Sequence, residues 1–481
     1  MQHFSLEKDV DIPSSSASSV WHGMHSMEGS DHDRIPRRDT EIDIEAGLDE
    51  KPEDDDQERN ARGGVLGGLV ARTISRSSMK EPGPPPDGGL VAWIQVVMAF
   101  LVLVNTWGII NSFGVFQTYY TTTLQRPPSD ISWIGSIQVF LLFFMGTFTG
   151  RIADAGYFKQ IFFFGTILSA IGIFMTSLSK TYLQLFLAQG VCLGLGNGCL
   201  FCPSLSLIST YFTTKKSMAI AIATTGSGIG GVVYPAMVQQ LLPRIGYGWT
   251  IRALGFIQFG SLLICNFGSK PRIKPRTSGP IVEWASFKEL PYLFYAIGMF
   301  FSFWGLYFGF YYIGSFARDL IGVTYSQSIN LLILMNGTGL IGRTIPGFLA
   351  DRYFGPLNTI LFGTLCTTVT IFGWIGVHDR AGTYAWAIMY GITSAIVQAL
   401  FPGTLSSLTT DLSKAGVRMG QVFTIVSFAC LTGPSIAGQL IQVKDGGYLY
   451  AQLYAGMCLL VSLFFLSAAK LAKSRDVLTK M

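Results

Sequence analysis

Three glycines in the stretch AIATTGSGIGG have the spacing that wraps the pyrophosphate of a dinucleotide in Rossmann-type enzymes. Gly226, Gly228 and Gly231 match G-x-G-x-x-G, which binds phosphate only where it follows a strand and opens a helix. Here it lies within residues 217–242, a run without a charged side chain that is long enough to cross a membrane. Small residues four apart, such as Gly226 and Gly230, instead predict close packing against another helix.

One ionisable side chain lies deep inside an apolar segment, Arg343 in NGTGLIGRTIPGFLAD. An unpaired arginine in hydrocarbon costs about 3 kcal/mol or more, so it is expected to face a cavity and hold a partner. Its planar guanidinium suits bidentate pairing with a substrate carboxylate. The alternative is that Arg343, eight residues before Asp351, extends to the nearby helix end or caps a neighbouring helix.

The remaining residues do not predict catalysis. No combination of nucleophile, acid and base occurs, and no metal-ligand spacing, so we expect neither an enzyme nor a cofactor nor a metal site. Cys199 and Cys202 form C-x-x-C inside an apolar stretch, where packing is favoured over redox chemistry. Asp, Glu and His are absent from the interior of the apolar segments, so any coupled proton is expected to travel on the substrate.

The composition is that of an all-α polytopic membrane protein. Apolar residues make up 49% of the chain, charged residues 13%, and glycine occurs 55 times in 481 residues. Residues 1–88 carry 10 Lys and Arg against 19 Asp and Glu, a net charge of −9, whereas the remaining 24 against 10 give +14. Residues 1–88 are predicted to be a disordered acidic cytosolic tail without a cleavable signal sequence.

Twelve apolar stretches have spanning length, six on each side of a polar segment. They are residues 90–119, 131–150, 160–179, 182–210, 216–242, 249–268, 291–317, 327–349, 357–377, 383–410, 416–442 and 447–470. We therefore predict six-helix bundles at residues 89–268 and 291–470, a cytosolic linker at residues 269–290 and a cytosolic tail at residues 471–481.

The two halves repeat each other. The stretch GRIAD at residues 150–154 matches GFLAD at residues 347–351, an offset of 197. Two pairs of prolines share an offset of 199, and they are Pro203 with Pro402 and Pro235 with Pro434. Three landmarks at nearly one offset indicate a duplicated unit in the same orientation, which predicts two parallel six-helix repeats. Counting Lys and Arg gives about twelve in the loops on the N-terminal side and about seven on the other, so both termini are expected to be cytosolic.

Twelve helices in two parallel halves, with G-x-x-x-D in each, resemble the major facilitator superfamily. The second copy, GFLADRYFG, has the Asp-Arg pair of that superfamily, whereas the first, GRIADAGYFK, has Ala155 at the basic position. The stretches PPPDGGLVAWIQVVMAF and YFTTKKSMAIAIATTGSGIGG resemble the two signatures of the monocarboxylate transporter family. Over residues 84–470 the chain looks most like the fungal branch of that family.

The resemblance also exposes departures at the substrate site. In animal lactate carriers of the family a lysine in helix one, and an aspartate and arginine four apart in helix eight, serve the substrate and the proton. The lysine position falls at about Asn111 and the aspartate position at Gly339, so Arg343 alone remains.

Other polar residues follow from the resemblance as candidate contacts on helices one, eight and ten. They are Asn105, Asn111, Asn336 and Gln398, each with interhelical hydrogen bonding as its alternative. Tyr311 or Tyr312 is a candidate for stacking on a substrate ring.

The resemblance implies a gate of Asp154, Asp351 and Arg352. The two carboxylates are expected to accept N–H groups at helix N-termini on the cytosolic side and to hold that side shut.

These features predict a secondary-active or facilitative carrier of a small, monocarboxylate-like organic anion, a symporter or uniporter that works by alternating access. The alternatives are a carrier of a larger or neutral metabolite, such as a vitamin like riboflavin or an exported secondary metabolite, and a nutrient sensor that binds without transport. We expect a multi-pass protein in the lipid bilayer, of the plasma membrane before the vacuolar membrane, with no nucleic-acid partner.

Overall fold

The described part of the chain is built from helices. This computed structural model describes residues 85–126, 128–273, 279–409, 411–443 and 446–474, and no strand occurs among them. A helix pairs its own backbone N–H and C=O groups, which hydrocarbon requires because it offers no water to pair with them. The all-α class predicted from the sequence is confirmed. The predicted acidic tail, residues 1–88, lies almost wholly outside the described residues.

The helices fall into two sets in chain order. The first set is α2 (Leu90–Asn111), α3 (Phe113–Leu124), α4 (Pro128–Phe144), α5 (Gly146–Ile152), α6 (Phe158–Leu178), α7 (Tyr182–Leu185), α8 (Leu193–Tyr211) and α9 (Lys216–Gly268). The second set is α10 (Leu290–Asp319), α11 (Tyr325–Leu349), α12 (Pro356–Gly373), α13 (Arg380–Ser407), α14 (Ala415–Val443) and α15 (Leu449–Lys473). Short helical turns complete them at Ala153–Tyr157, Phe186–Cys192, Trp284–Lys288, Ala350–Phe354, Trp374–Gly376 and Leu412–Lys414.

Nine helical stretches of the described chain are long and apolar enough to cross a membrane. Two of them, Asp130–Leu178 and Lys216–Gly268, have 49 and 53 residues and each contains a kink between two helices. The kinks lie at Gly156 and Gly246, whose φ angles of 93° and 74° favour glycine. Helix α11, with 25 residues, stands outside the nine. Each of the two long stretches supplies two crossings, one on either side of its kink. Together with α11, the described residues therefore supply the twelve predicted crossings.

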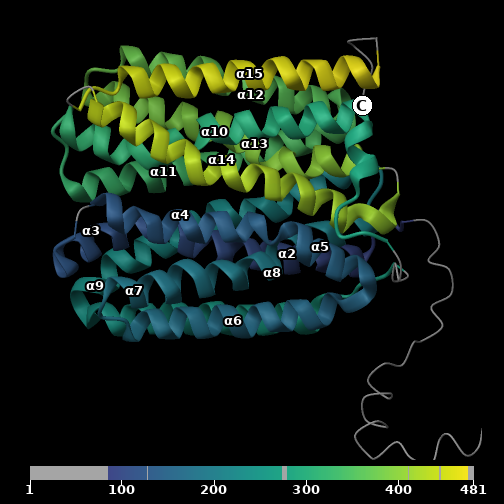
Figure 1. Cartoon of the computed structure of the whole chain (residues 1–481), viewed down its shortest axis with the longest axis horizontal. Helices are drawn as coiled ribbons and strands as arrows, with labels where there is room; N and C mark the ends of the chain where they lie inside the picture. Colours follow the sequence, from purple (N-terminus) through teal and green to yellow (C-terminus); the bar gives the residue numbers. More distant parts are fainter. Residues whose placement is uncertain (1–84, 127, 274–278, 410, 444–445, 475–481) are drawn as a thin grey trace, which may run out of the picture. The chain divides into compact units, whose positions relative to one another are not determined.

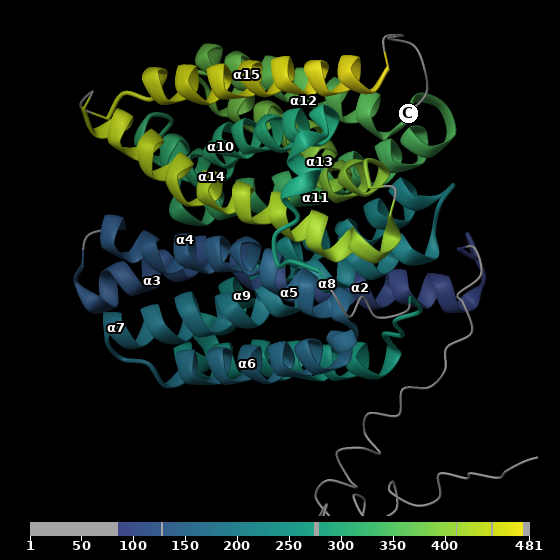
Figure 2. The ribbon, with the colours of Figure 1, turned by 45° about the vertical axis from the view of Figure 1, so that its right-hand side comes forward.

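The two sets of helices form two layers, with α10 to α15 in the upper layer of Figure 1 and α2 to α9 in the lower one. Within the layers, α2 packs along α9 and α10 along α15. Across the layers, α5 packs on α14 and α9 on α11, and Figure 2 shows α14 crossing above α4 and α5. In the internal repeat, α5 corresponds to α11 and α9 corresponds to α14. The two cross-layer pairs are therefore the same contact made twice, with the two halves interchanged, as expected of a duplicated unit.

The glycine-rich stretch of α9 is a packing surface. A Cβ atom added at Gly226 or Gly230 would collide with the backbone oxygen of Phe100 or Val104 in α2. The same helix turns Gly228 and Gly231 toward the second layer, where added Cβ atoms would meet Arg343 and Asn336. Small residues on both faces therefore let α9 lie close to α2 and α11 at once.

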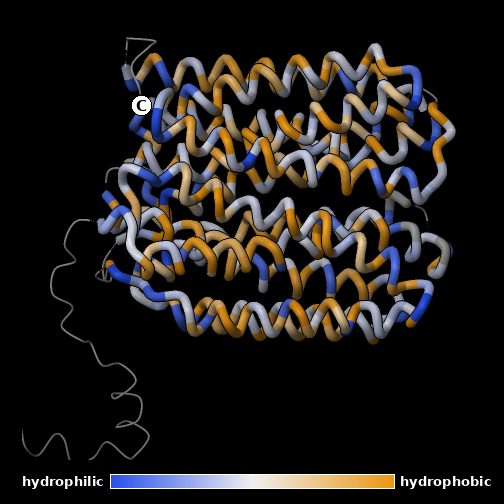
Figure 3. The backbone as a smooth tube through the Cα atoms, turned by 180° about the vertical axis from the view of Figure 1, so that it is seen from behind, coloured by the Kyte–Doolittle hydropathy of each residue, from blue (hydrophilic) through white to orange (hydrophobic). Residues whose placement is uncertain are grey.

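The outer surface is suited to lipid. Phe163, Phe256 and Phe464 are 53%, 61% and 69% exposed, although they are large and apolar. Hydrophobic residues run along the helices in Figure 3, and hydrophilic residues gather at the two ends of the bundle. Water would not tolerate so much exposed apolar surface, so the helices require a bilayer around them.

Gly230→Ala should destabilise the protein, because the added methyl group would meet the backbone of α2 rather than a movable side chain. The expected loss is about 1–3 kcal/mol, measured as a lower thermal midpoint in detergent. Gly260→Ala is the matched control in the same helix, since its added Cβ meets nothing within 4 Å. An equal midpoint for both variants would show that close approach of α2 and α9 is not required.

Candidate functional site

Two adjoining cavities lie between the helix layers, among the described residues. The larger, of about 820 Å³, is called the polar chamber and is lined in part by Asn111, Gln117, Ser227, Asn336, Arg343 and Gln398. The smaller, of about 390 Å³, is called the aromatic chamber and is lined in part by Phe143, Phe201, Phe303, Phe401 and Phe423.

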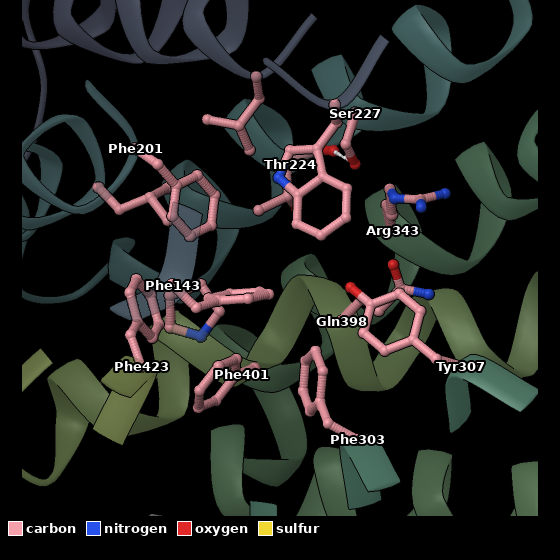
Figure 4. A pocket seen from close by; sticks show the side chains of 14 residues that line it. Phe143, Phe201, Thr224, Ser227, Phe303, Tyr307, Arg343, Gln398, Phe401 and Phe423 are labelled. Atoms are coloured by element: carbon pink, nitrogen blue, oxygen red, sulfur yellow. Dashed lines mark hydrogen bonds between the residues drawn. The ribbon is translucent and has the colours of Figure 1, made fainter. Parts of the chain in front are cut away.

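The two chambers share one wall. It is formed by Trp107 of α2, Ser227 of α9, Tyr307 of α10, Arg343 of α11 and Gln398 of α13. In Figure 4, Arg343, Gln398 and Tyr307 lie on one side of the aromatic chamber, and Phe143 and Phe423 lie opposite. A ligand at this wall would touch both helix layers.

Arg343 is buried in this wall with only 2% of its surface exposed. Its guanidinium occupies a slot between two glycines, since Nη1 lies 3.1 Å from a Cβ built at Gly228 and 2.5 Å from one built at Gly339. The side chain therefore faces the interior and does not extend to the helix end. Any larger residue at Gly339 would displace the guanidinium.

Four polar atoms of the shared wall have no hydrogen-bond partner among the described residues. They are Nε and Nη1 of Arg343, Nε2 of Gln398 and the hydroxyl oxygen of Tyr307. Three are N–H donors and the fourth is a hydroxyl that can also donate, so the unpaired atoms of the wall are mainly donors. Because buried polar groups are normally paired, this convergence marks a place for a ligand with acceptor oxygens.

The predicted asparagines separate into two groups. Asn111 and Asn336 both line the polar chamber, where Asn111 Nδ2 donates to Asn336 Oδ1 and to the Ser227 carbonyl at 3.5 Å each. Asn105 is not among the residues that line either chamber. Its Nδ2 donates to the Leu101 carbonyl at 2.6 Å, and its Oδ1 accepts the hydroxyl of Tyr234 at 2.6 Å. The geometry of Asn105 is that of interhelical hydrogen bonding.

Sequence reasoning missed the ring of phenylalanines. The residues come from α4, α8, α10, α13 and α14 and meet only in the fold, with centroids 5.5 Å apart for Phe143 and Phe201 and 5.0 Å apart for Phe303 and Phe401. A weak signal existed, because Phe201 lies two residues before Pro203 and Phe401 directly before Pro402, the repeated pair of prolines. Of the two tyrosines considered for stacking, Tyr311 lines the polar chamber, while the Tyr312 hydroxyl donates to the Pro434 carbonyl at 2.8 Å.

The two repeated aspartates tie the layers together away from the chambers. Asp154 accepts the N–H groups of Gly416 and Val417 at 3.1 and 2.8 Å, at the start of α14. Asp351 accepts those of Ser217 and Met218 at 3.1 and 2.7 Å, at the start of α9. Each carboxylate thus meets a helix N-terminus of the opposite layer, where the helix dipole favours negative charge. This end of the bundle is called the carboxylate end.

Arg352 follows Asp351 and lies at the same end. Its Nε donates to the Tyr353 hydroxyl at 3.2 Å, and its guanidinium lies over that ring at 5.6 Å from the centroid.

Arg418 is a second buried arginine, near the start of the predicted apolar stretch 416–442. It lies in the first turns of α14, is 3% exposed, and donates through Nη1 and Nη2 to the two carboxylate oxygens of Glu289 at 2.9 and 2.6 Å. This bidentate pair accounts for its burial. Arg343 differs because no such carboxylate faces its Nε and Nη1 among the described residues.

The two stretches that resemble transporter signatures touch each other. The Asp87 carboxylate accepts the N–H of Thr214 at 2.9 Å, and the N–H and hydroxyl of Thr213. Partial burial raises the pKa of Asp87, but these hydrogen bonds outweigh it and hold the pKa below its ordinary value. The start of α2 is thereby fixed to the turn before α9.

The sequence model of the Major Facilitator Superfamily matches residues 98–434. The chain belongs to this superfamily. Its members carry small molecules across membranes, so the chain is an integral membrane transporter with multiple spans, of a family that is not enzymatic. The fold agrees, because the E. coli fucose:proton symporter FucP superposes with a TM-score of 0.62 at 15% identity, covering 79% of this chain and 98% of that one.

Fungal relatives are closer in sequence. An MFS-type transporter of Gibberella zeae is 50% identical over 405 residues, covering 84% of this chain and 92% of that protein. The fujikurins efflux protein of Gibberella fujikuroi is 34% identical over 399 residues, covering 80% of this chain and 84% of that protein. These matches support the predicted similarity to fungal transporters of the superfamily. The resemblance to monocarboxylate transporters stays a prediction.

Arg343→Met should raise the stability of the ligand-free protein. Methionine removes buried N–H groups that have no partner, and each such group costs about 1–3 kcal/mol. The measurement is the thermal midpoint in detergent without substrate. Arg418→Met is the control and should lower the midpoint, because it leaves Glu289 without its bidentate partner. A lower midpoint for both variants would assign Arg343 a structural role.

Proposed function

We propose that the protein transports an organic acid whose carboxylate binds Arg343. The observation that carries this proposal is the buried guanidinium, which directs unpaired N–H groups into a cavity between the two helix layers. A carboxylate supplies two acceptor oxygens in one plane for the unpaired N–H groups of Arg343. Its negative charge also neutralises the buried guanidinium. Gln398, Asn111 and Asn336 then offer amide groups to further oxygens of the same molecule.

The chambers favour an acid with a substantial apolar body. The phenylalanine lining of the aromatic chamber adjoins the polar chamber, and a simple monocarboxylate has no apolar body to place against it. The fungal relative named an efflux protein favours export of such a metabolite by this chain as well. An exported amphipathic acid is both an organic anion, which is the predicted substrate, and a larger metabolite, which is the predicted alternative.

Alternating access follows from the two contacts at the carboxylate end. Asp154 and Asp351 each hold an N-terminus of the opposite layer, so these contacts must break before the chambers open at that end. We assign this end and both termini to the cytosol by the distribution of Lys and Arg. The plasma membrane stays the expected location, before the vacuolar membrane. Any transported proton would arrive on the acid itself, since arginine does not titrate in this role.

A non-transporting sensor is the competing function, and uptake by the wild type separates it from a carrier. Gly339→Asp tests the role of Arg343 in that uptake. The new carboxylate would lie against Arg343, whose Nη1 is 2.5 Å from the Cβ position, and would displace the substrate carboxylate. We expect Gly339→Asp to reduce uptake of radiolabelled organic acids into proteoliposomes at least tenfold. Gly339→Asn has the same shape without the charge and should retain more uptake.

Equal uptake by the two Gly339 variants would contradict the role of Arg343. Saturable binding without uptake in the wild type would favour the sensor.

The gate is tested with Cys202, which is fully buried at the carboxylate end with its Sγ 3.9 Å from the Gly416 carbonyl. In a variant that keeps this cysteine alone, Asp154→Asn should speed maleimide labelling about fivefold, because a charge at a helix N-terminus contributes about 1 kcal/mol. Asp130→Asn, whose partner is the exposed Arg126, should leave the rate unchanged. Unchanged labelling in Asp154→Asn would exclude this contact as a gate.

A further inference from the structure

Among the described residues of the chamber lining, the buried polar atoms without a hydrogen-bond partner all belong to the second half of the chain, α10 to α15. They are the atoms already described for the shared wall, from Tyr307 in α10, Arg343 in α11 and Gln398 in α13. In Figure 4 these three side chains lie on the same side of the aromatic chamber. The unpaired donors are therefore gathered in one of the two helix layers.

The first half of the chain turns a different polar surface toward the chambers. The Thr224 hydroxyl donates to the Ala221 carbonyl at 2.8 Å, and the Ser227 hydroxyl donates to the Thr224 carbonyl at 2.7 Å, a bond marked in Figure 4. A hydroxyl whose hydrogen is used in this way has only lone pairs left to offer. Because a carboxylate also has only lone pairs, these two hydroxyls do not suit the anionic end of a substrate.

The Tyr307 hydroxyl differs from those of Thr224 and Ser227. It is buried and has no partner among the described residues, so its hydrogen is free to donate to a ligand. The Tyr307 ring is held by Phe303 and Tyr311, at centroid distances of 5.7 and 6.3 Å, and such a preorganised group loses little conformational freedom on binding. Tyr307 lines the same two chambers as Arg343, so both donors can serve one ligand.

We propose that the carboxylate of the substrate is bound by the second half of the chain alone, with the Tyr307 hydroxyl as a further donor beside Arg343. This inference rests on the proposed function for the carboxylate and adds a residue that determines specificity. A carboxylate accepts about four hydrogen bonds, so Nε and Nη1 of Arg343 leave room for the hydroxyl. The first half contacts the apolar body instead, through Phe143 and Phe201 of the aromatic chamber. The two layers thus recognise different parts of one molecule.

The test compares an acid with the amide of the same shape. The probes are 4-phenylbutyrate and 4-phenylbutanamide, and their equilibrium binding to the purified full chain in detergent is measured at neutral pH, where the acid is ionised. The two molecules share one apolar body and differ only in the polar end. We expect the wild type to bind the acid about thirtyfold more tightly, since hydrogen bonds to a charged acceptor are about twice as strong as neutral ones.

Tyr307→Phe removes the hydroxyl and keeps the ring. The preference for the acid over the amide should fall about fivefold, because one charge-assisted hydrogen bond is lost. The ligand-free thermal midpoint should not fall, because the hydroxyl has no partner among the described residues. Tyr295→Phe in the same helix is the matched control, since its hydroxyl donates to the Phe401 carbonyl at 2.7 Å. This control should lower the midpoint and leave the preference unchanged.

Phe201→Leu tests the part played by the first half. Since Phe201 contacts the apolar body in this arrangement, the variant should weaken binding of the acid and of the amide about threefold each and leave the preference unchanged. An equal loss of preference in Phe201→Leu and Tyr307→Phe would overturn the division between the two halves.

The remaining outcomes separate this inference from the proposed function. A full preference in Tyr307→Phe, or a lower ligand-free midpoint for that variant, would overturn the role of its hydroxyl and leave carboxylate binding at Arg343 intact. Equal binding of the acid and the amide by the wild type, or binding of neither, would overturn the proposed function, and this inference with it.

Discussion

The structure depends on one constraint, the burial of the Arg343 guanidinium between two helix layers inside a membrane protein. Hydrocarbon cannot hold an unpaired cation at low cost, so the residue must be enclosed by protein and directed at a cavity. The surrounding glycines follow from this, since Gly228 and Gly339 leave the slot that the guanidinium fills. Helix α11 is accordingly too polar to stand among the apolar spans and is covered by α9 and α13.

The contacts at the carboxylate end complement this burial. Asp154 and Asp351 are related by the internal repeat and make equivalent contacts with α14 and α9. A carboxylate at a helix N-terminus contributes about 0.3–2 kcal/mol, which is enough to favour one arrangement of the layers and small enough to be broken repeatedly. The buried Arg418 pair with Glu289 lies within the second half of the chain, so it stabilises one layer without joining the two.

The chambers join two kinds of surface, a polar wall segment and an aromatic lining, as small-molecule sites commonly do. The polar side chains of the shared wall come from α9, α11 and α13, and the aromatic lining comes from helices of both layers. An amphipathic molecule would contact both surfaces at once, whereas a small polar acid would contact the polar surface alone. Efflux of an amphipathic acid therefore uses more of the observed lining than uptake of a lactate-like anion.

The sequence by itself determined the helical class, the twelve crossings and the repeat, because these depend on local apolar length and on the recurrence of short motifs. It also singled out Arg343, since a charge within an apolar run is visible without a fold. Only the tertiary structure decided that Asn105 bonds Tyr234 while Asn111 and Asn336 line a chamber. It alone brought five phenylalanines from five helices into one lining. The direction in which a side chain on an apolar helix points depends on which neighbour packs against it, and an aromatic residue facing lipid has the same local sequence as one facing a cavity.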